Sequence, residues 1–317
     1  MSVYDISGNV LATPTGGKYG FSLFHPYLPE AETSKATWAS YTAAQFIENI
    51  YEPLRTALPT YISRSVIGKD ATNTYDIYQY TFEPDYFEQT IYLQAGVHGY
   101  EEDGYIGLAR LMQLICNDWD THEGLAYLRW SCKIVVVPIV NVWSVSQATH
   151  VRDNSNGVNL NRDLVNKTQA ETIAVTSFFN TVNQNTPVSF AFDFHTTDYD
   201  SYGDYMLTVW TGSKNEYIAK HVLYYLARKN AHDRMQSYLT KYNLTEDTLR
   251  LPYVGDSTNT GTYAWWWNTL GIPCATVEHA DDVWDSQEHT ATAITKAVEN
   301  YVNQTIAHAD AKFRILM

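Results

Sequence analysis

The chain is poor in cysteine and has no long apolar segment. Its 317 residues include three cysteines, too few for a disulfide framework, so we expect Cys116, Cys132 and Cys274 to be buried thiols. The longest apolar runs fall far short of the roughly 20 residues that a membrane-spanning helix needs. No basic segment followed by an apolar run opens the chain. We therefore predict a cytoplasmic protein, with export through a phage or lysis system as the alternative.

Basic residues are also scarce. The chain carries 35 aspartates and glutamates against 21 lysines and arginines, which gives a formal net charge of −14. Such a surface repels nucleic acids and anionic membranes, so we predict neither as a partner. Charged residues make up 18% of the chain and hydrophobic residues 45%, which predicts a folded protein with a large core. Nothing in the composition indicates an oligomeric state.

Composition divides the chain only near its N-terminus. Residues 1–32 are rich in glycine, proline and tyrosine, and we interpret them as an N-terminal extension. Residues 33–317 show no further break in composition. We predict that they form a single catalytic domain, because α/β enzymes often exceed the usual domain size.

The first elements of this domain are predicted to be a helix and a hairpin. The helix is expected to be capped near Thr33 or Ser34 and to run through residues 43–58. Two strand-like stretches follow, at residues 60–68 and 75–82. A turn-forming segment joins them, so we expect them to pair as a hairpin.

Beyond residue 90, short apolar segments alternate with longer amphipathic ones. We expect strands at residues 91–97, 133–140, 189–194, 205–211 and 273–278. We expect helices at residues 102–117, 168–183, 215–241 and 286–309. This alternation predicts an α/β protein with helices packed on both faces of a sheet.

Polar residues stand at the ends of four of these strands. His98, Asn141 and His195 each follow a strand, and Glu278 ends another. Functional sites in open α/β sheets collect at the carboxyl ends of strands. We therefore expect these side chains to lie close together.

The first candidate metal ligands are His98 and Glu101, where a strand gives way to a helix. Their spacing can turn an imidazole and a carboxylate toward one point, and catalytic zinc commonly binds two histidines and one glutamate. Gly96 and Gly99 would let the backbone bend sharply there. The alternative is a surface histidine beside an acid that favours the first turn of a helix.

Two further candidates belong to later strands. His195 directly follows an apolar strand and could complete the metal site, with Asp193 or a backbone carbonyl orienting its ring. The alternative is a capping histidine, or one satisfied within the core. Glu278 could take a proton from water beside the metal and pass it to the leaving group. The alternative for Glu278 is an ordinary solvated strand end.

A polar stretch at residues 152–163 separates these elements. It contains Arg152 and Arg162 together with several asparagines. A guanidinium can bind a carboxylate through two parallel hydrogen bonds, or donate to a developing oxyanion. The alternative is a polar surface loop.

Taken together, these residues resemble the zinc metallocarboxypeptidase family of the carboxypeptidase A/B type, over roughly residues 35–310. The order of the motifs carries the resemblance: His-x-x-Glu, an arginine, Gly-Val-[Asp/Asn]-Leu-Asn-Arg, a histidine after a strand, and a late glutamate. In this chain they are His98 with Glu101, Arg152, residues 157–162, His195 and Glu278. The resemblance implies a three-layer α/β/α sandwich around a mixed, mostly eight-stranded sheet.

The resemblance also implies the cofactor and the central roles. One zinc ion per chain would be bound by His98, Glu101 and His195. Glu278 would be the base that activates water. Arg152 would polarise the scissile carbonyl and stabilise the oxyanion.

Other positions follow from the same resemblance. Asn161 and Arg162 would bind the terminal carboxylate of the substrate. Tyr253 is the nearest counterpart of the family's mobile tyrosine. Tyr263 falls at the position that sets side-chain preference, where an aromatic residue predicts a filled or hydrophobic pocket. Asn159 stands where the family often has an aspartate supporting the first zinc histidine, so we expect somewhat weaker metal affinity.

These observations predict a zinc metallopeptidase that cleaves an amide bond in a C-terminal or peptidoglycan-type peptide. A second hypothesis is an N-acyl amino acid deacylase, because the succinylglutamate desuccinylase and aspartoacylase branch shares the His-x-x-Glu, Leu-Asn-Arg and late glutamate motifs. A third is an inactive, phage-associated binding module on the same fold. The 25 tyrosines and 9 tryptophans fit a binding module. The intact metal and base residues favour an enzyme.

Overall fold

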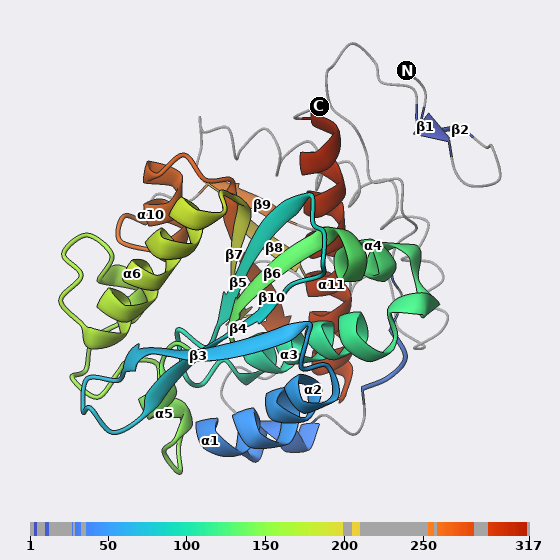
Figure 1. The fold of residues 1–317 in the computed structure, drawn as a ribbon. Helices are drawn as coiled ribbons and strands as arrows, with labels where there is room; N and C mark the ends of the chain where they lie inside the picture. Colours follow the sequence, from blue (N-terminus) through green and yellow to red (C-terminus); the bar gives the residue numbers. More distant parts are fainter. Residues whose placement is uncertain are drawn as a thin grey trace.

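The computed structural model describes residues 3–4, 10–12, 27, 29–32, 36–198, 205–209, 253–256, 259–281 and 291–315. The helix expected at residues 215–241 lies outside this part of the chain, as do Thr33 and Ser34. Where the structure is described, a twisted central sheet stands between two groups of helices (Figure 1).

The central sheet contains eight strands among the described residues, in the order β3–β4–β6–β5–β7–β10–β8–β9. Their bounds are Ile62–Lys69 (β3), Asp76–Phe82 (β4), Gln89–Ala95 (β5), Cys132–Val137 (β6), Val188–Asp198 (β7), Tyr205–Val209 (β8), Tyr253–Asp256 (β9) and Cys274–Asp281 (β10). The four central neighbours β6, β5, β7 and β10 run parallel, whereas β3–β4, β4–β6 and β10–β8 pair antiparallel. The predicted α/β class with a mixed sheet is therefore confirmed.

The parallel strands form the centre of the core because both of their faces are covered. All seven residues of β5 are buried, whereas β3 at the edge of the sheet is exposed along most of its length. Strands buried on both faces read as nearly continuous apolar runs, which is why β5 and β6 were recognisable in the sequence. Their carboxyl ends point to one edge of the sheet, where His98 and Asn141 follow.

The helices form one layer on each face of the sheet. Helices α3 (Glu102–Asn117), α4 (Glu123–Ser131) and α11 (Ala291–Ile315) cover one face, and α6 (Ala170–Asn185) and α10 (Tyr263–Thr269) cover the other (Figure 1). Helices α3 and α11 approach closely at Gly107, where a Cβ atom would lie 2.7 Å from the ring of Tyr301. The three-layer α/β/α arrangement is confirmed.

The first helical segment begins later than predicted. Thr42 caps it through a reciprocal capping box with Gln45. Its parts are α1 (Ala43–Phe46), a π-helical turn (Ile47–Tyr51) and α2 (Glu52–Ala57). The π turn directly precedes the turn that contains Pro53, whose ring nitrogen has no hydrogen to donate. The helix that was expected to start after Thr33 or Ser34 begins at Ala43 in the structure, where Gln45 completes the capping box with Thr42.

The predicted hairpin is confirmed as the antiparallel pair β3–β4. Its turn is organised by Asp70, whose carboxylate accepts hydrogen bonds from the backbone N–H groups of Thr72, Thr74 and Tyr75. Among the described residues, the elements that were not expected from the sequence include α4, β9 and α10. Each is nine residues or shorter, too short to show a clear period.

Shorter elements complete the described chain. They are β1 (Val3–Tyr4), β2 (Val10–Ala12), α5 (Val142–Val145) and the 3₁₀ turns Ala36–Ser40, Trp119–Thr121 and Leu160–Arg162. None of the helices in the described ranges is both long and apolar enough to cross a bilayer. All three cysteines are free and buried, as predicted.

Two described residues of the N-terminal segment contact α11. The backbone N–H of Tyr27 donates to Oδ1 of Asn303 at 2.8 Å, and the Asn303 amide donates back to the Tyr27 carbonyl at 2.9 Å. The N–H of Glu32 donates to Oγ1 of Thr295 at 2.9 Å. These contacts join residues 27–32 to the helix layer, while the division at residue 32 stays a prediction.

Candidate metal centre

His98 lies in the tight turn between β5 and α3. At the next residue, Gly99, a Cβ atom would collide with the side chain of Ser144, so a larger residue would force the two segments apart. The N–H of Gly99 donates to the carbonyl of Val151 at 3.0 Å. This bond ties the turn that carries His98 to the segment leading into Arg152.

The three predicted metal ligands converge. Nδ1 of His98 is 2.6 Å from Oε1 of Glu101, and Nδ1 of His195 is 2.7 Å from Oε2 of the same carboxylate. One donor atom of each residue lies within 4.8 Å of the other two, and all three side chains are buried. His98 follows β5 and His195 belongs to the parallel neighbour β7, so strand pairing brings together residues 97 positions apart. Two imidazoles and a carboxylate form a donor set that catalytic zinc uses.

The outer nitrogen of each imidazole has its own partner. Nε2 of His98 is 3.0 Å from Oδ1 of Asn159, and Nε2 of His195 is 2.7 Å from Oδ2 of Asp193. An oxygen acceptor at Nε2 holds the hydrogen there, which leaves the lone pair of Nδ1 facing the centre. When neutral, each ring is therefore held in the tautomer that can bind a metal through Nδ1.

Burial and charge oppose each other at these groups. Burial by itself raises the pKa of Glu101, but the imidazoles of His98 and His195 outweigh it and hold that pKa well below its ordinary value. Burial lowers the pKa of His195, yet the carboxylates of Asp193 and Glu101 outweigh burial and hold it well above its ordinary value. The centre therefore favours an ionised Glu101, the form that binds a cation.

Glu278 lies beside His195 in the sheet. The parallel strands β7 and β10 pair with Glu278 opposite His195, so both side chains leave the same face of the sheet. Glu278 as a whole is half-buried, and the protein packed around its carboxyl raises the pKa to about 8; the carboxylates of Glu101 and Asp193 act in the same direction, against His195 and Arg152. A carboxyl that titrates near neutrality is suited to both accepting and donating a proton.

Arg152 reaches the centre from the loop after α5. Its Nη1 donates to the phenolic oxygen of Tyr100 at 2.7 Å and lies 3.7 Å from Oε1 of Glu101. The loop is anchored by the fully buried Asn141, whose amide donates to the carbonyls of Arg152 at 3.4 Å and Asp153 at 3.1 Å. The predicted oxyanion donor therefore stands next to the metal ligands.

Asn161 and Arg162 lie in the 3₁₀ turn Leu160–Arg162. Nδ2 of Asn161 is 3.5 Å from Nε2 of His195, and its Oδ1 accepts from the N–H of Tyr263 at 3.0 Å. Arg162 donates to the carbonyl of Asn161 at 2.6 Å. Partial burial, together with the nearby guanidinium of Arg152, lowers the pKa of Arg162, against the opposing charge of Glu278. Two cationic groups therefore flank the candidate base.

The structure describes the side chain of only one of the two predicted tyrosines, Tyr263. Tyr263 is fully buried at the start of α10, with its ring 5.8 Å from that of Trp267. Trp266 and Trp267 are also buried, so the tryptophan run serves mainly as core packing. The side chain of Tyr253 lies outside the part of the chain that the structure describes. Substrate contacts by either tyrosine stay predictions.

Tyr100 is the functional candidate that the sequence analysis missed. It lies inside the His-x-x-Glu motif, one residue before Glu101, and its ring is nearly parallel to that of His98 at 14°, with centroids 6.3 Å apart. Its position inside the motif was the available signal. Nothing in the sequence indicated that its partner would be Arg152, 52 residues later.

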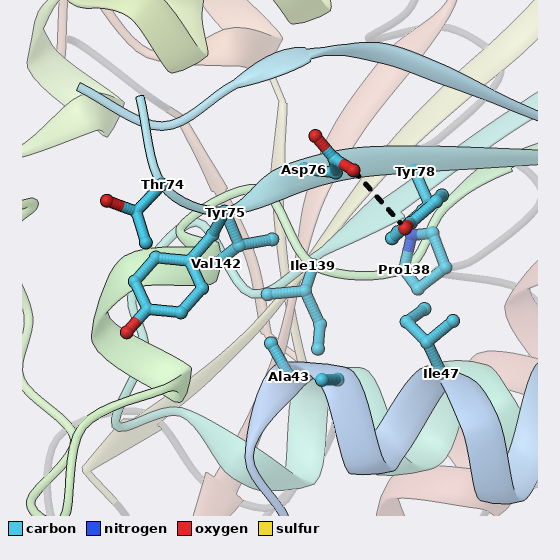
Figure 2. Close-up of a pocket in the computed structure, with 10 residues that line it drawn as sticks. Ala43, Ile47, Thr74, Tyr75, Asp76, Tyr78, Pro138, Ile139 and Val142 are labelled. Atoms are coloured by element: carbon cyan, nitrogen blue, oxygen red, sulfur yellow. Dashed lines mark hydrogen bonds between the residues drawn. The ribbon is translucent and has the colours of Figure 1, made fainter. Parts of the chain in front are cut away.

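A small pocket of about 140 Å³ lies beside the loop after β6 and shares no residue with the metal centre. Figure 2 shows Ala43 and Ile47 of the first helical segment facing Ile139, with Tyr75 and Tyr78 of the hairpin on the other side. Ile139 also packs under Gly96, two residues before His98. Polar side chains also line the pocket, and the hydroxyl of Tyr78 donates to the carboxylate of Asp76 at 3.4 Å.

No protein-family model matches the chain, and no curated protein matches it in sequence. Solved structures do match. Thrombin-activatable fibrinolysis inhibitor aligns with a TM-score of 0.69 at 14% identity, over 89% of this chain and 79% of that one. The carboxypeptidase A of Helicoverpa armigera aligns with a TM-score of 0.66 at 13% identity, over 89% and 79%. A metallo-carboxypeptidase from Burkholderia cenocepacia gives 0.61 at 13% identity, over 85% and 69%.

The chain has the metallocarboxypeptidase fold. The resemblance drawn from the motifs is thereby confirmed at the level of architecture. Identities this low show the fold alone, because one fold can carry several chemistries. The function of this chain depends on His98, Glu101, His195 and the residues around them.

Proposed function

We propose that the chain is a zinc-dependent hydrolase of the carboxypeptidase type, which cleaves an amide bond next to a terminal carboxylate. The observation that carries the proposal is the convergence of His98, Glu101 and His195 with Glu278 paired beside His195 in the sheet. Hydrolysis at a metal centre needs both a metal-binding set and a proton acceptor next to it.

The residues fit a zinc ion. The three donor groups are buried, and each imidazole has its outer nitrogen held by an oxygen acceptor, Asn159 for His98 and Asp193 for His195. Three protein ligands with a fourth position left for water are the pattern of catalytic zinc sites. The chemistry that zinc supplies at such a site is a lowered pKa for water and a polarised carbonyl oxygen.

The surrounding residues would divide the remaining work. Glu278 would accept the proton of the attacking water and return it to the leaving amine, because its pKa of about 8 lies near neutrality. Arg152 would donate to the carbonyl oxygen as negative charge develops there. Arg162 and Asn161 would bind the terminal carboxylate of the substrate, since a guanidinium matches a carboxylate in shape and charge.

The test compares zinc-free and zinc-loaded protein on three substrate groups: peptides with a free C-terminus, N-acyl amino acids and muropeptides. Each peptide is paired with its C-terminal amide. We expect activity only after zinc is added, and at least about a hundredfold preference for the free carboxylate. Arg162→Gln should remove most of that preference. A zinc-loaded protein that cleaves free and amidated peptides equally well would contradict the proposed substrate class.

The same panel separates the alternatives. Rapid hydrolysis of N-acyl amino acids, with peptides left intact, would identify a deacylase. Cleavage restricted to muropeptides would make the natural substrate a peptidoglycan stem. Zinc binding without hydrolysis of any substrate would point to a binding module that retains the metal.

A further inference from the structure

The guanidinium of Arg152 lies between two oxygen atoms that compete for it. Its Nη1 is 2.7 Å from the phenolic oxygen of Tyr100 and 3.7 Å from Oε1 of Glu101. The first contact is a hydrogen bond, whereas the second is an ion pair that is too long for a hydrogen bond. The side chain of Arg152 is 41% exposed, so it is only partly packed.

A carboxylate is the stronger acceptor of the two. Hydrogen bonds between a guanidinium and an ionised carboxylate are about twice as strong as bonds to neutral groups. A movement of about 1 Å would bring Arg152 into contact with the same oxygen of Glu101 that lies 2.6 Å from Nδ1 of His98. Such a direct hydrogen bond would occupy a metal-ligand oxygen and remove the arginine from the substrate side of the centre.

Both ends of the Tyr100–Arg152 contact are fixed by the backbone. Gly99 is packed against Ser144, and Ser144 bonds both the N–H and the carbonyl of Val151 at 2.7 Å. The carbonyl of Arg152 accepts from Asn141. These contacts hold the backbone at Gly99 close to the backbone at Val151 and Arg152. A change of partner from Tyr100 to Glu101 would therefore involve the side chain of Arg152.

We propose that Tyr100 is a positioning residue that keeps the ion pair of Arg152 and Glu101 too long for a direct hydrogen bond, so that the oxygen of Glu101 stays available to the metal. The consequence for catalysis rests on the function proposed above, whereas the consequence for metal binding does not. Tyr100→Phe removes only the phenolic oxygen and keeps the ring beside His98. Arg152 then forms a direct hydrogen bond with Glu101, and zinc has to displace it.

The test is a double-mutant cycle read by zinc affinity, measured by competition with a chromophoric chelator. We expect Tyr100→Phe to weaken zinc binding about fivefold, the scale of one partly exposed ion pair. The second mutation, Arg152→Gln, is then made in two backgrounds, the wild type and Tyr100→Phe. It should improve zinc affinity by a larger factor in the Tyr100→Phe background. Tyr86→Phe, at a tyrosine that is 72% exposed, is the matched control and should change nothing.

Two results would overturn this proposal. One is an unchanged zinc affinity in folded Tyr100→Phe. The other is a loss of affinity equal in both arginine backgrounds, which would mean that the phenol supports the metal site through packing. Thermal unfolding of each zinc-free variant checks that it is folded. Arg152→Lys tests the same contact from the other side. The shorter lysine should not reach the phenolic oxygen of Tyr100, so Tyr100→Phe should have a smaller effect in that background. Wild-type protein that binds zinc but hydrolyses nothing would refute the proposed function and leave the affinity cycle readable.

Discussion

The candidate centre has two halves that are built differently. His195 and Glu278 belong to the paired strands β7 and β10, and the hydrogen bonds of the sheet set their separation. His98, Glu101 and Arg152 lie in turns and loops, and polar side chains such as the buried Asn141 and the partly buried Asn159 hold them. The strand half takes its geometry from the main chain, which tolerates many sequences. The loop half depends on individual side chains.

The two halves also differ in the charge behind each imidazole. His195 has a carboxylate, Asp193, at its outer nitrogen, whereas His98 has the neutral amide of Asn159. A carboxylate partner raises the basicity of the imidazole and so strengthens its bond to a metal. Only one of the two histidines therefore has a negatively charged partner: Asp193 lies behind His195, whereas the neutral Asn159 lies behind His98.

Breaking the strand half at its proton acceptor should have the largest effect on turnover. Glu278→Gln keeps the shape of the side chain but cannot accept a proton. We expect kcat to fall by about a hundredfold or more while zinc affinity stays close to that of the wild type. Steady-state kinetics and metal analysis measure the two quantities, with Glu48→Gln on the exposed side of the first helical segment as control. An unchanged rate in Glu278→Gln would end the proposed mechanism.

Removing the charge behind His195 should act on metal binding. In Asp193→Asn the new amide can still present an oxygen to Nε2 of His195. Gln94 now donates to Asp193 at 3.2 Å and has an unpartnered Oε1, so it can rotate to accept from the new amide. The fold should therefore persist, while zinc affinity falls about ten- to a hundredfold. Chelator competition measures the change, and Asp85→Asn at an exposed aspartate is the control. Zinc binding as tight as in the wild type would show that the charge has no role.

The loop half should be broken by removing its anchor. Asn141→Ala deletes the cap of α5 and leaves the carbonyls of Arg152 and Asp153 without this buried donor. We expect the free energy of unfolding to fall by about 2 to 4 kcal/mol, from the lost cap and the unsatisfied carbonyls. Urea unfolding of the zinc-free protein measures it. Asn180→Ala, at an exposed site in α6, should cost far less. Equal losses in the two variants would contradict the anchoring role of Asn141.

Making the two halves alike should have the smallest effect. Asn159→Asp gives His98 a carboxylate partner, as His195 already has. The side chain must still accept from the N–H of Asn161, now 2.9 Å away, which a carboxylate can do. We expect zinc affinity to rise several-fold, because a charged acceptor makes the imidazole a better ligand. Chelator competition detects the gain, and a decrease would show that the extra negative charge is not tolerated there.

Much of the fold could be predicted because its longer helices and buried strands have characteristic patterns of apolar residues. The buried parallel strands β5 and β6 are continuous apolar runs, and α3 and α6 are long enough to show a helical period. The four-residue strand β9 and the seven-residue helix α10 were missed. The first helical segment starts later than expected because the capping box of Thr42 with Gln45 fixes its start.

The sequence by itself determined which chemistry the centre could hold. The spacing of His98 and Glu101, and the placing of His195 and Glu278 on apolar strands, are local facts about side-chain type and order. Only the tertiary structure decided the partners: Asp193 behind His195, Asn159 behind His98, and Tyr100 against Arg152. The physical reason is that strand pairing and loop packing join residues far apart in the chain. A hydrogen bond made or missed there depends on displacements of about 1 Å, which no local pattern records.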